Sequence, residues 1–310
     1  MKTEKEESMK KNNLKGIPIL CTAALIWGLS FVAQSVAADI LSAFTINSLR
    51  SFVGALVLLV INTVKSRGKS FFPTSKTERK KYLRAALICG FFFSVAANLQ
   101  QFGIMLYPDG VPNEARAGFL TALYVVFVPI FGLLFGKKTG GLVLVGVAIS
   151  AVGVYLLCLK NGFHGIYLGD LLLLLCSFGY TMHILTVDRY VEFTGGIKLC
   201  ILQLTVCGVI SGILAIFLEH PALSQIIAGA PYILYLGVFS SGIAYTLQVI
   251  GQQYAEPAVA SLSMCLESVF AALGGWILLG NTLTGREILG CALMLIAILI
   301  AQIPELHAKT

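Results

Sequence analysis

Ten stretches of this sequence are apolar and long enough to cross a lipid bilayer. A helix needs about 20 residues to traverse a hydrocarbon core of roughly 30 Å, and polar turns separate these stretches. Only 12% of the residues are charged, whereas soluble domains carry about 25%. The sequence therefore predicts an all-α integral membrane protein whose ten transmembrane helices, here spans one to ten, lie near 16–37, 43–64, 83–106, 115–136, 140–159, 168–187, 197–218, 231–253, 257–279 and 286–303.

The positive charges alternate with the spans. Lysines and arginines gather in the N-terminal tail and in 65–84, on one side, and only Arg116, Lys160 and Arg286 fall in loops on the other. Cytoplasmic loops carry an excess of Lys and Arg, so a multi-pass protein of the cell (inner or plasma) membrane with both termini in the cytoplasm is predicted, with 107–114 outside. We interpret the basic 65–84 loop as a topology determinant near anionic lipid headgroups. The lipid bilayer is the expected partner, and nucleic acid is not.

Two segments of the first half of the chain recur in the second half. "GFFFSVAANLQQ" (90–101) aligns without a gap with "GVFSSGIAYTLQ" (237–248), and "WGLSF" (27–31) aligns with "FGYTM" (178–182). Each alignment matches a span with the one five spans later, and because five is odd the second copy crosses the membrane in the opposite sense. The prediction is two inverted five-helix repeats, with a cytoplasmic tail at 1–15, repeats at 16–159 and 160–303, and a second tail at 304–310.

Polar residues form matching stripes on the repeated spans. In span three, Ser94, Asn98 and Gln101 share one helix face, and the alignment pairs them with Ser241, Tyr245 and Gln248 of span eight. In lipid, such groups face the bundle interior, either as hydrogen bonds between helices or as the lining of a shared cavity. Matched stripes favour the cavity. The candidate substrate-binding residues are Asn98, Gln101, Tyr245 and Gln248, with Trp27 and Gln34 of span one, Tyr124 of span four, and Tyr180 and His183 of span six.

Two charged residues lie inside the spans. Glu267 is near the middle of "SLSMCLESVFAALGGWILLG" (261–280) and shares a helix face with small residues, which predicts that it points inward. An acidic residue at mid-span costs about 2.5–3.5 kcal/mol on insertion scales. A buried hydrogen-bond network is one explanation. The other is a functional carboxyl group that binds a cationic group of the substrate or exchanges a proton, which makes the proton a candidate coupling ion.

Arg50 is the second charged residue within a span. It lies roughly 10 Å below the outer surface if each residue rises 1.5 Å. At that depth its side chain either reaches the headgroups as an anchor or faces the interior near the outer end of the cavity. Pro129 is a further special residue, because proline lacks an N–H and is expected to bend span four.

The sequence lacks the motifs of several other classes of protein. It contains no G-x-x-x-x-G-K-[ST] loop, no H-E-x-x-H, no G-x-S-x-G and no pair of aspartates within the spans. The eight cysteines include no C-x-x-C pair. No metal site, no cofactor and no catalytic residue is therefore predicted, and the chain is not expected to be an enzyme.

Four segments resemble the drug/metabolite transporter superfamily, and specifically its EamA-type exporters with ten spans. They are "ALIWGLSFVAQSVA" (24–37), "NSLRSFVGALVLL" (47–59), "AGFLTALYVVFVPIFGLLFG" (117–136) and "ESVFAALGGWILLG" (267–280). The resemblance implies an inner-membrane exporter of small metabolites that works by alternating access. Spans four and nine of this family often end in Leu-Gly-Glu, but here Lys137 and Asn281 follow the glycines, and Ser268 replaces a common proline. No role of those family residues is carried over.

The prediction for function combines the residues with this resemblance. It is a secondary transporter that exports a small polar, amino-acid-like metabolite across the inner membrane, with a small-molecule substrate as its partner. An importer of a similar solute is an alternative, and so is a membrane-embedded enzyme or sensor that uses the central polar cavity. The missing catalytic motifs weigh against the enzyme.

Overall fold

The computed structural model describes residues 13–66, 71–107, 113–136, 139–158, 167–279 and 284–307, and these residues form helices joined by short turns. Helices suit a membrane because each one satisfies its own backbone hydrogen bonds. The elements are α2 (Asn13–Ala38), α3 (Ala43–Ser66), α4 (Lys76–Met105), α5 (Asn113–Ala122), α6 (Tyr124–Leu134), α7 (Gly141–Cys158), α8 (Leu168–Thr194), α9 (Gly196–Leu214), η2 (Ala215–Glu219), α10 (Leu223–Tyr235), η3 (Leu236–Ala244), α11 (Tyr245–Tyr254), α12 (Pro257–Met264), α13 (Glu267–Leu279) and α14 (Gly285–His307).

These helices account for all ten predicted spans. Eight helical segments of the described chain are long and apolar enough to cross a membrane, and α7 contains a shorter apolar one. The tenth span is α14, with 23 residues. Several helices extend past the predicted limits, because a helix can continue into the interface beyond the hydrocarbon core. The tails 1–12 and 308–310, most of the 107–114 loop, and the repeat boundary at 159–166 lie outside the described residues.

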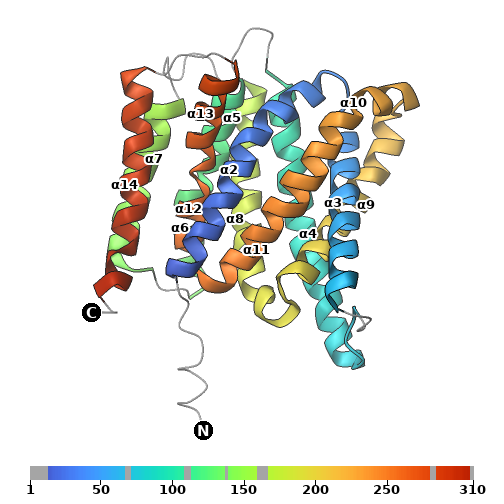
Figure 1. Ribbon diagram of the computed structural model, residues 1–310, viewed down its shortest axis with the longest axis horizontal. Helices are drawn as coiled ribbons and strands as arrows, with labels where there is room; N and C mark the ends of the chain where they lie inside the picture. Colours follow the sequence, from blue (N-terminus) through green and yellow to red (C-terminus); the bar gives the residue numbers. More distant parts are fainter. Residues whose placement is uncertain are drawn as a thin grey trace.

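The packing of the helices has an approximate two-fold symmetry. Span three packs on span six, α4 against α8, as span eight packs on span one, α11 and η3 against α2. Likewise α4 contacts α9 as η3 contacts α3. The pairs α3–α9 and α7–α14 join equivalent spans of the two halves, at opposite sides of the bundle (Figure 1). The fold is therefore two inverted five-helix repeats, and the start of α2 and the end of α14 lie at the same end of the bundle (Figure 1).

Spans four and nine are each interrupted in the middle. Span four breaks at Leu123, between α5 and α6, with φ −59° and ψ −14°. Span nine breaks at Cys265 and Leu266, between α12 and α13, and Cys265 has nearly the same backbone angles, φ −64° and ψ −11°. The halves cross in a two-fold arrangement, α5 against α13 and α6 against α12.

The interruption of span four does not coincide with Pro129, the residue expected to bend this span. Pro129 lies inside α6, and the break comes more than a turn earlier, at Leu123. Span nine has no proline between Pro257 and its end but breaks at the equivalent place. The equivalent break in span nine shows that an interruption at this place does not require a proline.

Candidate functional site

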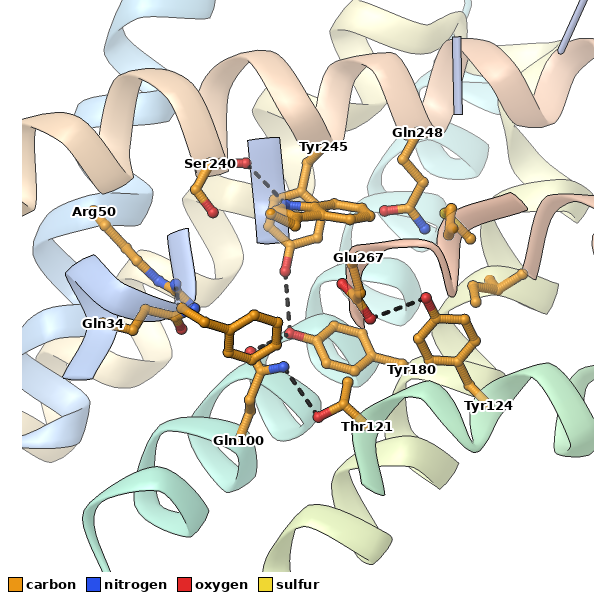
Figure 2. A pocket seen from close by; sticks show the side chains of 14 residues that line it. Gln34, Arg50, Gln100, Thr121, Tyr124, Tyr180, Ser240, Tyr245, Gln248 and Glu267 are labelled. Carbon is orange, nitrogen blue, oxygen red and sulfur yellow. Dashed lines mark hydrogen bonds between the residues drawn. The ribbon is translucent and has the colours of Figure 1, made fainter. Parts of the chain in front are cut away.

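A pocket lies at the centre of the bundle, between the two broken spans and spans one, two, three, six and eight. The space within it that atoms do not occupy, including its opening, is about 450 Å³. Figure 2 shows the polar side chains that converge on it. Its lining residues are Trp27, Phe31, Gln34, Arg50, Gln100, Thr121, Tyr124, Tyr180, Ile184, Ser240, Tyr245, Gln248, Met264 and Glu267.

Most of the lining consists of two-fold-related pairs. Leu20 of α2 packs on Gly251 as Leu173 of α8 packs on Gly103, so Trp27 is equivalent to Tyr180 and Phe31 to Ile184. This corrects the sequence alignment, which paired Trp27 with Phe178. Equivalent residues of the two repeats therefore meet around the pseudo-two-fold axis. The pairs are Trp27 with Tyr180, Phe31 with Ile184, Gln100 with Gln248, Thr121 with Met264, and Tyr124 with Glu267.

The remaining four lining residues have no partner of this kind in the pocket. They are Gln34, Arg50, Ser240 and Tyr245. Gln34 is near the end of α2 and Arg50 near the start of α3, and these two helix ends lie at the end of the bundle opposite to the start of α2 (Figure 1). The pocket therefore extends from the axis toward that end alone.

Glu267 is held at the break in span nine. It is the first residue of α13, and its side chain is 5% exposed. Its partner Tyr124 is the first residue of α6, and the Tyr124 hydroxyl donates a 3.0 Å hydrogen bond to Glu267 Oε1 (Figure 2). Gly28 lets α2 approach closely here, since a Cβ at that position would lie 2.7 Å from the Glu267 carbonyl oxygen. The two interruptions therefore place one carboxyl and one phenol side by side.

Arg50 lies across the pocket from Glu267 (Figure 2) and is 2% exposed. Its Nη1 donates a 3.1 Å hydrogen bond to Gln34 Oε1, whereas Nε and Nη2 have no hydrogen-bond partner among the described residues. A guanidinium group remains charged in proteins and carries five N–H donors. A buried cation with unused donors therefore lines one side of the pocket.

A chain of hydrogen bonds crosses the pocket between these charges. The Tyr180 hydroxyl donates to Gln100 Oε1 at 3.2 Å, so the 3.1 Å contact between Tyr180 and Tyr245 has the Tyr245 hydroxyl as donor. Gln100 Nε2 donates in turn to Thr121 Oγ1 at 3.3 Å. The Tyr245 ring also packs on Trp27, with ring centroids 4.8 Å apart. Aromatic packing and hydrogen bonds together give this wall a defined shape.

Three of the sequence candidates lie outside the pocket lining. Asn98 belongs to a buried cluster behind it and makes hydrogen bonds of 2.8 Å to Ser211 Oγ and 3.0 Å to Asn47. Gln101 donates to the backbone oxygen of Gln34 at 3.3 Å. The His183 Nε2 atom lies 2.9 Å from Gln203 Oε1. These three side chains therefore form hydrogen bonds between neighbouring helices, which was one of the two explanations for the polar stripes, and do not line the cavity. The other eight candidates line the pocket.

Gln100 is the lining residue that the alignment of the repeats misassigned. The ungapped alignment pairs Gln248 with Gln101, but in the structure its equivalent is Gln100. Gly90 and Gly237 are equivalent, because they make corresponding contacts with Val206 and Val53. Gly103 and Gly251 are equivalent in the same way, through contacts with Leu173 and Leu20. The distance in sequence from Gly103 to Gly251 is one residue longer than the distance from Gly90 to Gly237. The π-helix η3 lies between these points, and its i→i+5 bonds, such as Tyr245 N–H to Ser240 O, accommodate an extra residue.

Comparisons with known proteins agree with this architecture. A family model described as the EamA-like transporter family matches the chain in two segments, residues 14–159 and 167–302. An uncharacterized transporter of Archaeoglobus fulgidus is 27% identical over 292 residues, which cover 92% of this chain and 84% of that protein. One crystal structure superimposes with a TM-score of 0.75 at 18% identity, over 96% of this chain and 99% of the other, and shows the fold alone.

Proposed function

Because the chain belongs to the EamA-like transporter family, we propose that it is a secondary transporter that exports a small amino-acid-like metabolite across the inner membrane. The substrate site is the central pocket. The two halves of the chain alternate in opening this pocket to either side, as inverted repeats do in other transporters. The distribution of Lys and Arg supports a cytoplasmic location for both termini, so the pocket extends toward the outer face.

The observation that carries this proposal is a buried guanidinium group and a buried carboxyl group that line one pocket. Arg50 offers N–H donors that have no partner among the residues that the structure describes, and a guanidinium group recognises a carboxylate in a bidentate manner. Glu267 faces the same space, and its carboxyl group accepts a hydrogen bond from the neutral phenol of Tyr124. A molecule with a carboxylate at one end and an ammonium group at the other fits both. An α-amino acid is the simplest such molecule.

Glu267 also supports a role for protons in the cycle. A carboxyl group that binds an ammonium group in its ionised form can take up a proton once the substrate has left. Export of the substrate would then be exchanged for entry of a proton at the same carboxyl oxygen. This exchange needs no second ion site, and among the described residues no cluster of three metal-ligating side chains occurs.

Counterflow in proteoliposomes that contain only this protein tests the proposal. Vesicles loaded with an unlabelled amino acid should accumulate the labelled one, whereas protein-free vesicles and vesicles with Arg50→Gln should not. Arg50→Gln must remain folded, which a thermal unfolding curve in detergent checks. Exchange of solutes without an amino group, at equal rates in the wild type and in Arg50→Gln, would contradict the proposal.

A further inference from the structure

Beside the pocket, the orientation of the Gln252 amide is fixed by a backbone carbonyl group. Gln252 lies one helical turn from Gln248 on α11 and is fully buried. Its Nε2 donates a 2.9 Å hydrogen bond to the Ile184 backbone oxygen of α8. A backbone oxygen can only accept, so the amide nitrogen of Gln252 must face Ile184 and its Oε1 must face the other way.

The orientation of Gln252 determines that of Gln248. Gln252 Oε1 accepts a 3.2 Å hydrogen bond from Gln248 Nε2. Because that position needs a donor, the Gln248 amide cannot turn over without loss of the bond. Within the described part of the chain its Oε1 has no hydrogen-bond partner, although the residue is only 2% exposed. An unpartnered buried acceptor costs free energy, and this one belongs to a residue that extends from α11 into the pocket (Figure 2).

The two-fold partner of Gln248 provides an internal contrast. Gln100 uses both ends of its amide, because its Oε1 accepts from Tyr180 and its Nε2 donates to Thr121. The glutamine amide of the first repeat therefore has hydrogen-bond partners for both its oxygen and its nitrogen, whereas the equivalent amide of the second repeat has an oxygen without a partner among the described residues. The open acceptor lies in the repeat that also supplies Glu267.

We propose that Gln248 Oε1 is a specificity-determining acceptor that binds an N–H of the substrate's amino group, next to the carboxyl group of Glu267. Gln252 is a positioning residue that keeps this oxygen directed into the pocket. The proposal rests on the proposed function. A carboxylate alone attracts any cation, but a second fixed acceptor requires N–H donors. The site therefore discriminates between a primary ammonium group and a fully methylated one of equal charge. The apolar lining residues Phe31, Ile184 and Met264 suit an apolar side chain.

L-Leucine and N,N,N-trimethyl-L-leucine are the probes for the test, since both are zwitterions and only the first has N–H groups. Their dissociation constants are measured by calorimetry on the purified full-length protein. We expect the wild type to favour leucine and Gln248→Leu to reduce the preference about tenfold, the effect of a hydrogen bond to a charged group. Gln252→Leu, which does not line the pocket, should reduce it partly. Gln100→Leu is the matched control and should lower affinity for both ligands alike.

The outcomes separate this inference from the proposed function. An unchanged preference in folded Gln248→Leu, or an equal loss in Gln248→Leu and Gln100→Leu, would overturn the role of Gln248 while leaving an amino-acid site intact. If Gln248→Leu does not fold, an unchanged preference in Gln252→Leu has the same meaning. Failure of the wild type to bind either zwitterion would instead overturn the proposed function, and this inference with it.

Discussion

Arg50 and Glu267 are ionisable side chains that are buried within the spans, where a charge is poorly hydrated. Each is almost fully buried, and the two do not form an ion pair with each other: Arg50 bonds to the neutral Gln34, and Glu267 to the neutral Tyr124. A charged acidic side chain at mid-span costs about 2.5–3.5 kcal/mol on insertion scales. In these contacts neither the Arg50 guanidinium group nor the Glu267 carboxyl group has a partner of opposite charge. Substrate binding would supply the missing partners to both.

Glu267→Gln tests the carboxyl group alone. The glutamine oxygen still accepts the Tyr124 hydroxyl, so the unfolding temperature should stay within a few degrees of the wild type. Loss of the negative charge should weaken binding of an amino acid at least tenfold, since hydrogen bonds to charged groups contribute about 1.5–3 kcal/mol. The dependence of transport on the proton gradient should disappear. Normal transport with an unchanged pH profile would reduce Glu267 to a structural residue.

Asn98 and Tyr245 should separate stability from binding. Asn98→Ala removes hydrogen bonds to Ser211 and Asn47 in a buried cluster, so we expect a loss of stability of about 1–3 kcal/mol. Tyr245→Phe keeps the contact with Trp27 and removes only the hydroxyl, so folded yield should persist while affinity falls several-fold. Thermal unfolding and ligand binding on the same preparations make the comparison. The reverse pattern would place the binding site at Asn98.

At the scale of helices, the bilayer makes some features predictable from sequence and leaves others hidden. Span number and the inverted repeat follow from apolar length and from parity. The breaks do not, because no residue of span nine signals one at Cys265. The extra residue in η3 is also hidden, because the repeat aligns without a gap across it, and this moved the predicted polar face from Gln100 to Gln101. The position of Glu267 could be predicted because a charge in a span has to face inward.

The contact between α2 and α13 should be sensitive to added volume. A Cβ at Gly28 would lie 2.6–2.7 Å from Phe270 Cβ, the Ala271 nitrogen and the Glu267 oxygen, which are mostly backbone atoms. We expect Gly28→Ala to move α13, to cost about 1–3 kcal/mol and to weaken binding. Gly274→Ala is the control in the same interface, because there a Cβ would meet only the flexible end of Leu29. Equal effects of the two substitutions on binding would count against this positioning of Glu267.

For the whole molecule, the asymmetry of the pocket indicates which residues would exchange roles if the proposed transporter alternates between two states. Val53 and Val206 are equivalent, because they pack on the equivalent glycines Gly237 and Gly90. Arg50 and Gln203 each lie three residues before these valines, so they correspond to each other. Arg50 lines the pocket, whereas Gln203 is fully buried against His183. If the halves exchange conformations, the contact between His183 and Gln203 opens when the pocket faces the other side.

Accessibility of Gln203→Cys to an impermeant thiol reagent measures this exchange, in a background where the native cysteines are replaced. We expect labelling from the side of the termini only, and faster labelling during turnover than in the resting protein. Arg50→Cys should show the opposite sidedness. Labelling of both positions from one side, or no labelling of Gln203→Cys during transport, would be incompatible with two halves that exchange conformations.

The most direct test of the central claim is a comparison of three ligands of nearly equal size. L-Leucine carries a carboxylate and an ammonium group, 3-methylbutylamine lacks the carboxylate, and 4-methylpentanoate lacks the amino group. Calorimetric titration of each into the purified protein should give a dissociation constant for leucine at least about tenfold below those of the other two, because only leucine pairs with both Arg50 and Glu267. Binding of either singly charged ligand as tightly as leucine would contradict recognition of both charges by one pocket.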